Sequence, residues 1–403
     1  MREKPVPQAA LLLLLCRLAP LAPAALAGSA GLLAPDWVRP GACLTYDLLT
    51  GSVGGSLNGI ELNENGDLYT DGRRYVTERG GNSSHGLVQA IVAGVDGQSA
   101  ALSQSFYLIA GMDTIPMLNS HQDAVVTLDT GGDFWMHPRK QEQTIREHPW
   151  AGTQRPGSYM ARATAWQSGG QSWAATAIIS LGDTGKTFWV YDRATGRLLY
   201  LSRVARVPPT YRDPSKPLRD APSYATFLRY VGARQLNQPW LGMAMPEWAR
   251  QLRGLSYRGQ SGIEFPGAAP SAQPLSQDLE VEQNGGSWMV LRSRGMARGQ
   301  VMIAESKVVS GSGCLLPYLI PPAALAKLTA GQVIDRDAHT GYNVSVAAID
   351  AQSVTLQLNN SRQVMQFVYS RSQGLLIRTL SRERSTSGTN MFILRQMELV
   401  GTR

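Results

Sequence analysis

The sequence predicts a mainly β protein made of two related antiparallel β-meander domains in tandem, each with one short helix. Three observations lead to this prediction. Four short motifs occur twice in the same order, apolar residues alternate with polar ones in several stretches, and hairpin-type turn dipeptides separate those stretches. The pattern leaves open whether each sheet closes into a barrel, forms a half-barrel or packs as a sandwich.

The first 27 residues have the organisation of a secretory signal peptide. Arg2 and Lys4 form a basic start, an apolar run occupies 9–16, and Ala-Leu-Ala at 25–27 is a small-x-small cleavage site. Arg17 ends the apolar run far short of the roughly 20 residues that span a bilayer. We therefore expect export to the periplasm or the extracellular space, with no transmembrane segment after removal of the leader.

The three cysteines allow at most one disulfide in the mature chain. Cys16 lies in the leader, and Leu15 before it is bulky where the lipid-attachment motif of a bacterial lipoprotein has a small residue. Cys43 and Cys314 remain after cleavage, and an oxidising compartment would permit a bond between them. Their spacing says nothing about proximity, and no zinc-type cysteine pair is present.

The charge of the chain is positive but dispersed. The formal net charge is +8, which falls to about +6 without the leader, and the arginines form no dense run. Such a surface suits anionic envelope polymers or lipid head groups, and solvated strand faces explain it equally well. Because export removes the usual partner and no basic–aromatic cluster is present, nucleic acid is not an expected partner.

Four motifs recur in the mature chain. The first pair, PDWVR at 35–39 and PEWAR at 246–250, lies 211 residues apart, and the last pair lies 166 residues apart. The decreasing separation indicates that the second copy has shorter loops. The second pair is WMHP at 135–138 with YLIP at 318–321, and the third is formed by the stretches at 188–199 and 366–377. The last pair is FLR at 227–229 with ILR at 393–395.

Prolines mark the junction between the copies. Pro239 and Pro246 bracket a short connector. We predict a signal peptide at 1–27, a first β-rich copy at 28–240 and a second, shorter β-rich copy at 245–403.

Strand and turn signals dominate each copy. Val354, Leu356 and Leu358 alternate with polar residues, as in a half-buried strand, and residues 188–191 and 367–369 are aromatic or β-branched. Hairpin turns are predicted at Asn-Gly or Asp-Gly pairs, which tolerate a positive φ. These pairs are at 65–66, 96–97 and 284–285.

One helix is predicted in each copy, and each follows a proline. In the second copy Pro321 and Pro322 precede an apolar helix that runs to Leu328, and proline is well tolerated in a first turn. The counterpart at 138–145 is polar, so we expect it to be the more exposed helix.

The motifs at 37–46, 191–199 and 246–248 resemble those of an uncharacterised group of exported bacterial β-repeat proteins. The resemblance spans most of the mature chain and concerns structural residues. It implies export and the repeated architecture, and it implies no activity or cofactor.

Residues 180–187, SLGDTGKT, come close to a phosphate-binding loop. Ser180 replaces the first glycine, and a strand pattern follows where that loop needs a helix N-terminus. We therefore predict a hairpin turn here. No nucleophile elbow, zinc-protease helix, EF-hand loop or dinucleotide fingerprint is present.

The histidines provide the only candidate chemistry. His85, His121, His137 and His148 are four of the five histidines, and Asp123 lies among them. On a strand His121 and Asp123 would share one face, and His137 or His148 would complete an open zinc site. All five residues are catalytic candidates, and all but His85 are candidate zinc ligands. The alternative is that they are polar surface residues. Because His137 aligns with Ile320, such a site would belong to the first copy alone.

Three functions are compatible with these features. The favoured hypothesis is a non-catalytic binding or envelope-structural protein with an unknown envelope or extracellular ligand, because no catalytic motif was found. The alternatives are a secreted hydrolase, with or without a metal, whose site lies in the first copy, and a protein that binds lipid or a membrane surface. A polar pocket with convergent His and Asp side chains would favour the enzyme, a closed apolar cavity a lipid carrier, and a shallow groove the binding protein.

Overall fold

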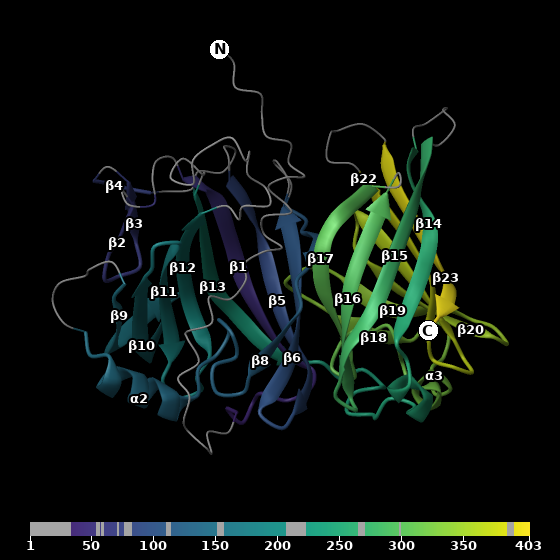
Figure 1. Cartoon of the computed structure of the whole chain (residues 1–403), viewed down its shortest axis with the longest axis horizontal. Helices are drawn as coiled ribbons and strands as arrows, with labels where there is room; N and C mark the ends of the chain where they lie inside the picture. The colour runs from purple at the N-terminus through teal and green to yellow at the C-terminus, as the bar shows by residue number, and fades with distance from the viewer. Residues whose placement is uncertain are drawn as a thin grey trace, which may run out of the picture. The chain divides into compact units, whose positions relative to one another are not determined.

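The computed structural model shows a mainly β chain with two large antiparallel sheets of ten strands each (Figure 1). It describes residues 34–53, 57, 60–70, 72–75, 83–109, 114–150, 157–206, 223–264, 271–297, 300–384 and 391–403. The predicted signal peptide, including Cys16, lies outside the described residues. Within the described residues no helix has the length and apolar character needed to cross a membrane.

The first sheet has the order β7-β6-β5-β1-β13-β12-β11-β10-β9, and β8 also pairs with β6. Its strands are β1 (Ala42–Val53), β5 (Ser83–Asp96), β6 (Ser99–Ile109), β7 (Met117–His121), β8 (Ala124–Thr127), β9 (Tyr159–Ser168), β10 (Gln171–Leu181), β11 (Gly185–Asp192), β12 (Leu198–Arg206) and β13 (Ser223–Gln235). A separate small sheet contains β2 (Ile60–Leu62), β3 (Leu68–Thr70) and β4 (Arg73–Arg74).

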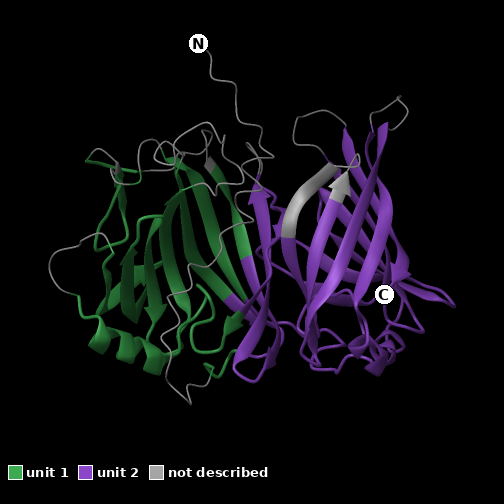
Figure 2. Ribbon diagram, viewed as in Figure 1, with its two compact units in different colours: residues 1–38, 44–88, 126–232 green, residues 39–43, 89–125, 233–403 purple. Residues whose placement is uncertain are grey.

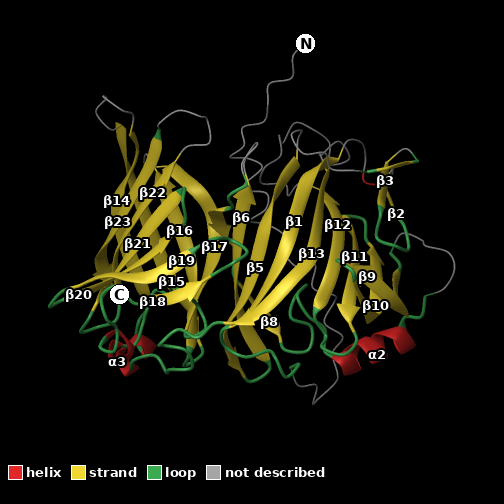
Figure 3. Ribbon diagram, turned by 180° about the vertical axis from the view of Figure 1, so that it is seen from behind, coloured by secondary structure: helices red, strands yellow, loops and turns green. Residues whose placement is uncertain are grey.

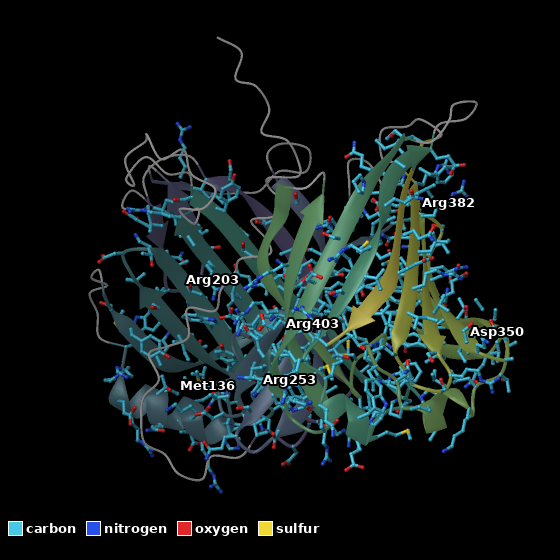
Figure 4. All side chains as sticks on the ribbon, turned by 45° about the vertical axis from the view of Figure 1, so that its right-hand side comes forward. Met136, Arg203, Arg253, Asp350, Arg382 and Arg403 are labelled. Carbon is cyan, nitrogen blue, oxygen red and sulfur yellow. The ribbon has the colours of Figure 1, made fainter. Side chains whose placement is uncertain are left out.

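The second sheet has the order β17-β16-β15-β14-β23-β22-β21-β20-β19-β18. The backbone of Arg403, the last residue, exchanges hydrogen bonds with Gly254 at 2.9 and 3.1 Å, which aligns the last strand with the first; Figure 4 labels Arg403 and the neighbouring Arg253. The strands are β14 (Gly254–Glu264), β15 (Ser271–Asn284), β16 (Trp288–Ala297), β17 (Gln300–Gly311), β18 (Val333–Arg336), β19 (Asn343–Ile349), β20 (Ser353–Asn359), β21 (Gln363–Ser370), β22 (Leu376–Arg384) and β23 (Phe392–Thr402).

The two sheets have the same topology. In each, the first long strand pairs with the last one, β1 with β13 and β14 with β23, and the other strands follow outward in chain order. Among the described residues, each copy has one short α-helix, which falls between β8 and β9 in the first copy and between β17 and β18 in the second (Figure 3). The predicted pair of related antiparallel meanders is therefore confirmed. Among the described residues the end strands of neither sheet pair with each other, so the sheets are open and not closed barrels.

Local sequence patterns account for several elements. In β20 the buried positions alternate with half-buried ones, as the spacing of Val354, Leu356 and Leu358 predicts. The segment at 180–187 is the predicted hairpin turn between β10 and β11, closed by the Gly182 amide, which donates to the Gly185 carbonyl at 2.9 Å. Gly66 and Gly97 have positive φ as predicted, but in the third turn the positive φ falls on Gly286 instead of Gly285.

The helices are α2 (Pro138–Glu147) and α3 (Pro322–Leu325), and each has proline at its first position. The expectation that polar α2 is an exposed helix is wrong for one of its faces. Lys140, Gln141 and Thr144 are buried, and the Gln141 side-chain amide donates to the carbonyls of Met136 and Asp192. Polar groups that form hydrogen bonds can be buried at little free-energy cost. A prediction from apolar residues alone does not take this into account.

The segment before each helix forms the same corner in both copies, in which its backbone is hydrogen-bonded to a glycine later in the chain. This corner shows how the two copies align. The amides of Met136 and Ile320 donate to the carbonyls of Gly196 and Gly374, at 2.9 and 2.8 Å. His137 and Pro321 are the respective N-cap residues. The predicted match of His137 with Ile320 is therefore wrong by one residue. The sequence alignment matched Pro138 with Pro321. In the structure Pro138 corresponds to Pro322, because each is the first residue of its helix.

A buried tyrosine repeats at this corner. The Tyr191 hydroxyl donates to the Asp133 carbonyl at 3.3 Å, and the Tyr369 hydroxyl donates to the Pro317 carbonyl at 2.8 Å. The corner is thus conserved between the copies in its hydrogen bonds as well as in its backbone path.

The chain forms two compact units (Figure 2). One contains residues 1–38, 44–88 and 126–232, and the other contains 39–43, 89–125 and 233–403. The division therefore passes through β1, β5 and β13, whereas the sheets themselves change between Gln235 and Gly254. In the first unit, the main apolar cluster lies between the small sheet and strands β10 to β13.

Candidate functional site

The first unit contains a pocket of about 360 Å³ between the small sheet and one face of the large sheet. We call residues 60–70 and 72–75, which include β2, β3 and β4, the flap. The flap supplies one wall, and β1, β5, β12 and β13 supply the other. The lining residues are Asp47, Leu48, Leu49, Asp67, Leu68, Arg74, Tyr75, His85, Tyr200, Phe227 and Arg229.

The flap is held on the sheet by apolar side chains. Ile60, Leu62 and Leu68 are at most 2 % exposed and belong to the cluster that contains Phe188 and Val190 of β11. Burying each such side chain contributes about 1.5–3 kcal/mol. The flap is therefore part of the folded core, and the space beside it is a preformed pocket.

Polar contacts fix the turn of the flap and its edge. Asn63 Oδ1 accepts hydrogen bonds from the amides of Asn65 and Asp67, at 2.9 and 2.8 Å, which closes the turn between β2 and β3. The Lys186 ammonium of β11 donates to the Ile60 carbonyl, and Arg162 of β9 pairs with Glu64 at 3.0 Å. These contacts fix the position of Asp67, which lines the pocket.

Aromatic rings form one wall of the pocket. Tyr75 of the flap stacks on Phe227 of β13, with ring centroids 6.5 Å apart and planes inclined by 14°. Tyr200 stacks on Trp166 at 5.1 Å and stands directly opposite Arg229 in the register of β12 and β13. Burial raises the pKa of Tyr75, and it raises that of Tyr200 to about 12, so both hydroxyls remain protonated at neutral pH.

Charged side chains of both signs converge on the same space. Arg74 and Asp67, both from the flap, form an ion pair. β1 and β13 are neighbours, and the contacts of Tyr46 with Tyr230 and of Thr50 with Thr226 indicate a register in which Asp47 stands opposite Arg229. Among the described residues, the side chains of Asp47, Arg229 and His85 form no ion pair or hydrogen bond with one another or with other residues.

The lining is suited to binding. Its described residues include no serine, threonine or cysteine, and its tyrosines are protonated. It does contain a ring wall and three polar side chains whose hydrogen-bonding capacity is not used within the described residues. A preformed pocket with an apolar wall and a few convergent polar groups is the usual form of a small-ligand site.

No protein-family model matches the chain, and no curated protein matches it. Among solved structures, similar chains include a protein of unknown function from Nostoc punctiforme in the DUF3598 family (10 % identity, 89 % of this chain and 96 % of that chain covered, TM-score 0.14). Another is a double mutant of transferrin binding protein B from Haemophilus parasuis (8 % identity, 91 % of this chain and 78 % of that chain covered, TM-score 0.16). A third is a provisionally named outer membrane protein from Bacteroides fragilis (8 % identity, 89 % of this chain and 97 % of that chain covered, TM-score 0.15). At these values the likeness assigns neither a family nor a function to this chain.

Of the sequence-predicted candidates, only His85 lines the pocket. His121, at the end of β7, is exposed, and its Nδ1 lies 3.1 Å from Ser105 Oγ. Asp123 is buried, and its carboxylate accepts hydrogen bonds from the amides of Gln104 and Val309, at 3.0 and 2.7 Å. Burial raises the pKa of Asp123 to about 7, although those amides and Ser103 oppose the rise. His121 and Asp123 belong to the second unit.

His137 and His148 cap the two ends of α2 in the first unit. His137 Nδ1 accepts from the Arg139 amide at 3.2 Å, and the ring of His148 packs edge-on against Tyr159. The proposed zinc ligands are thus divided between the units. Over the described residues no group of three or more His, Cys, Asp or Glu is placed to hold a metal ion, which gives the zinc hypothesis no support.

The cysteines of the mature chain are both buried thiols in separate apolar clusters of the second unit. Cys43 packs with Ile91 and Leu236, and Cys314 packs with Trp288 and Val309. Burial raises the pKa of Cys314 to about 12, so its thiol is unreactive at neutral pH. The structure contains no disulfide between them.

The pocket was not predicted from the sequence, although a difference in connection length between the two copies marks its location. Residues 54–82, 29 in number, separate β1 from β5, whereas only six residues, 265–270, separate the equivalent β14 and β15. The fall in the repeat separation from 211 to 183 residues occurs across this segment. An insertion in one copy of a duplicated fold is a reasonable place to look for function.

Proposed function

We propose that this chain is an exported, non-catalytic binding protein whose ligand site is the pocket beneath the flap. The observation that carries the proposal is the convergence of Asp47, His85 and Arg229 on a preformed pocket with an aromatic wall. Export rests on the leader sequence. The aromatic wall and the convergent charged side chains support a binding site, and the charged lining favours a polar small molecule over an acyl chain.

The duplicated architecture offers a matched control. Phe227-Leu228-Arg229 of β13 corresponds in the repeat to Ile393-Leu394-Arg395 of β23. Arg229 and Arg395 are both exposed, but the segment that builds the flap is absent between β14 and β15. A change at Arg395 therefore reproduces the loss of a strand arginine without touching the pocket.

The test is a screen of the mature protein against a broad set of polar small molecules, read by thermal shift and confirmed by calorimetry. We expect a ligand whose affinity falls about tenfold or more in Phe227→Ala and Arg229→Ala but is unchanged in Arg395→Ala. Circular dichroism would verify that each variant is folded. Ligands whose affinity is the same in all four proteins, or a screen that finds no ligand, would overturn the proposal.

A further inference from the structure

We infer that the pocket recognises a small zwitterion with an apolar ring, such as an aromatic α-amino acid; this inference rests on the binding function proposed above. Two features of the pocket lead to it. One is a pair of opposite charges on adjacent strands that form no ion pair among the described residues, and the other is the ring wall beside them.

The register indicated by the Tyr46–Tyr230 and Thr50–Thr226 contacts makes Asp47 and Arg229 a cross-strand pair. Residues directly opposite each other in an antiparallel pair have Cβ atoms about 5 Å apart, and opposite charges at this spacing usually attract. Here, among the described residues, neither side chain enters an ion pair, although Arg74 and Asp67 in the same pocket do. The pocket therefore holds one carboxylate and one guanidinium that no described residue pairs with.

A zwitterion matches this pair of charges. The planar guanidinium of Arg229 would accept a ligand carboxylate in two parallel hydrogen bonds. The carboxylate of Asp47 accepts hydrogen bonds only, so it would take the ligand ammonium. A ligand with only one charge would make a charge-assisted contact with only one of the two side chains, and would therefore bind less tightly.

The apolar part of the ligand has a surface next to the charges. On the pocket face of the sheet, Leu49 lies two residues after Asp47 and Phe227 lies two residues before Arg229, so the four side chains share one face. Tyr75 of the flap covers Phe227. A ring extending from the charged end of the ligand would therefore lie along Leu49 and Phe227, beneath the flap.

The experiment measures by calorimetry the affinity of the mature protein for four probes. L-Phenylalanine has both charges and the ring, L-phenylalaninamide lacks the carboxylate, 3-phenylpropanoate lacks the ammonium, and glycine lacks the ring. We expect L-phenylalanine to bind at least about tenfold more tightly than each of the others. Equal affinities, or binding of single-charge probes alone, would overturn the inference.

Two conservative variants show which side chain binds which charge of the ligand. Arg229→Gln is expected to lower the affinity for L-phenylalanine about tenfold and to leave the affinity for L-phenylalaninamide unchanged. Asp47→Asn should lower the affinity for L-phenylalanine and leave the affinity for 3-phenylpropanoate unchanged. Arg395→Gln serves as the control and should alter no affinity. If no probe binds but the broader screen finds a ligand that depends on Phe227, the zwitterion inference fails and the proposed function stands. If that screen also finds none, both fail.

Discussion

Gly374 lies directly against the carbonyl oxygen of Ile320: its φ is +74°, and a Cβ atom on it would come within 1.9 Å of that oxygen. Gly196 and Met136 repeat this arrangement in the first copy, with a φ of +75° and a distance of 2.5 Å. The corner therefore requires glycine twice over, for its backbone conformation and for space.

We predict that Gly374→Ala lowers the free energy of unfolding by roughly 2–4 kcal/mol, because it adds a steric clash to an unfavourable φ. Gly331→Ala is the control, since Gly331 has a φ of +79° but no atom within 4 Å of an added Cβ, and it should cost about 1 kcal/mol. Urea unfolding followed by circular dichroism measures both. Equal losses in the two variants would show that the close approach to Ile320 is unimportant.

Asp123 is expected to make stability fall as the pH rises. Burial raises its pKa to about 7 in the folded protein, above the ordinary value of 3.8. The protonated carboxyl is thus favoured in the folded state, so this contribution is fully present below pH 4 and is lost as the pH rises through about 7. The loss is at most roughly 4 kcal/mol.

Asp123→Asn removes this titration. Compared with the wild type, the variant should gain relative stability between pH 4 and pH 8, as measured by urea unfolding at several pH values. Parallel stability curves for the two proteins would show that Asp123 does not titrate in this range.

Arg234 in the second unit forms ion pairs with two carboxylates that are largely buried. It lies 2.5 Å from Asp335 and 3.4 Å from Asp337, whose side chain is 4 % exposed. Burial acts to raise the pKa of Asp337, but Arg234, Gln89 and two backbone amides outweigh it and hold that pKa below its ordinary value. We predict that Arg234→Met costs about 3–5 kcal/mol, because it leaves buried negative charge without a countercharge.

The matched control for Arg234 is Arg258→Met. Arg258 pairs with Asp278 at 3.1 Å, but the two side chains are 46 % and 34 % exposed. Solvent screens this pair, so its loss should cost under about 1 kcal/mol. Chemical denaturation compares the two variants, and similar small losses in both would contradict a stabilising role for the Arg234 network.

Asn63 is predicted to order the pocket without determining global stability. Asn63→Ala removes the acceptor for the amides of Asn65 and Asp67, so hydrogen exchange in β2 and β3 should accelerate and ligand affinity should fall several-fold. Asn360→Ala removes an equivalent turn in the second unit, where Asn360 Oδ1 accepts from the amides of Arg362 and Gln363. That variant should leave ligand affinity unchanged; the opposite pattern would mean that the flap does not form the site.

Much of the fold could be predicted because its signals are local. The alternation in β20, the turn glycines and the prolines that begin both helices are determined by neighbouring residues. The burial of Gln141 could not be predicted, since it depends on carbonyls supplied by Met136 and Asp192. The one-residue error in the match of His137 arose because Pro321 and Pro322 offer two alignments.

The site was harder to predict because its residues come from four strands and the flap. Asp47 and Arg229 are 182 positions apart, and only the pairing of β1 with β13 brings them together. The uneven distribution of histidines drew attention to residues 85–148, yet of those candidates only His85 lines the pocket. Residue types alone cannot identify a site whose residues are brought together only by the pairing of strands that are distant in the sequence.

The histidines offer the most direct test of the pocket, because His85 lines it and His121, His137, His148 and His339 do not. Selective labelling of histidine rings would give one pair of resonances for each residue in an NMR titration of the mature protein with its ligand. If the ligand binds beneath the flap, the His85 resonances shift until they saturate, and the dissociation constant from this titration equals the one from calorimetry. The resonances of the other four histidines do not shift. A saturable shift at any other histidine with His85 unmoved would contradict the location of the site.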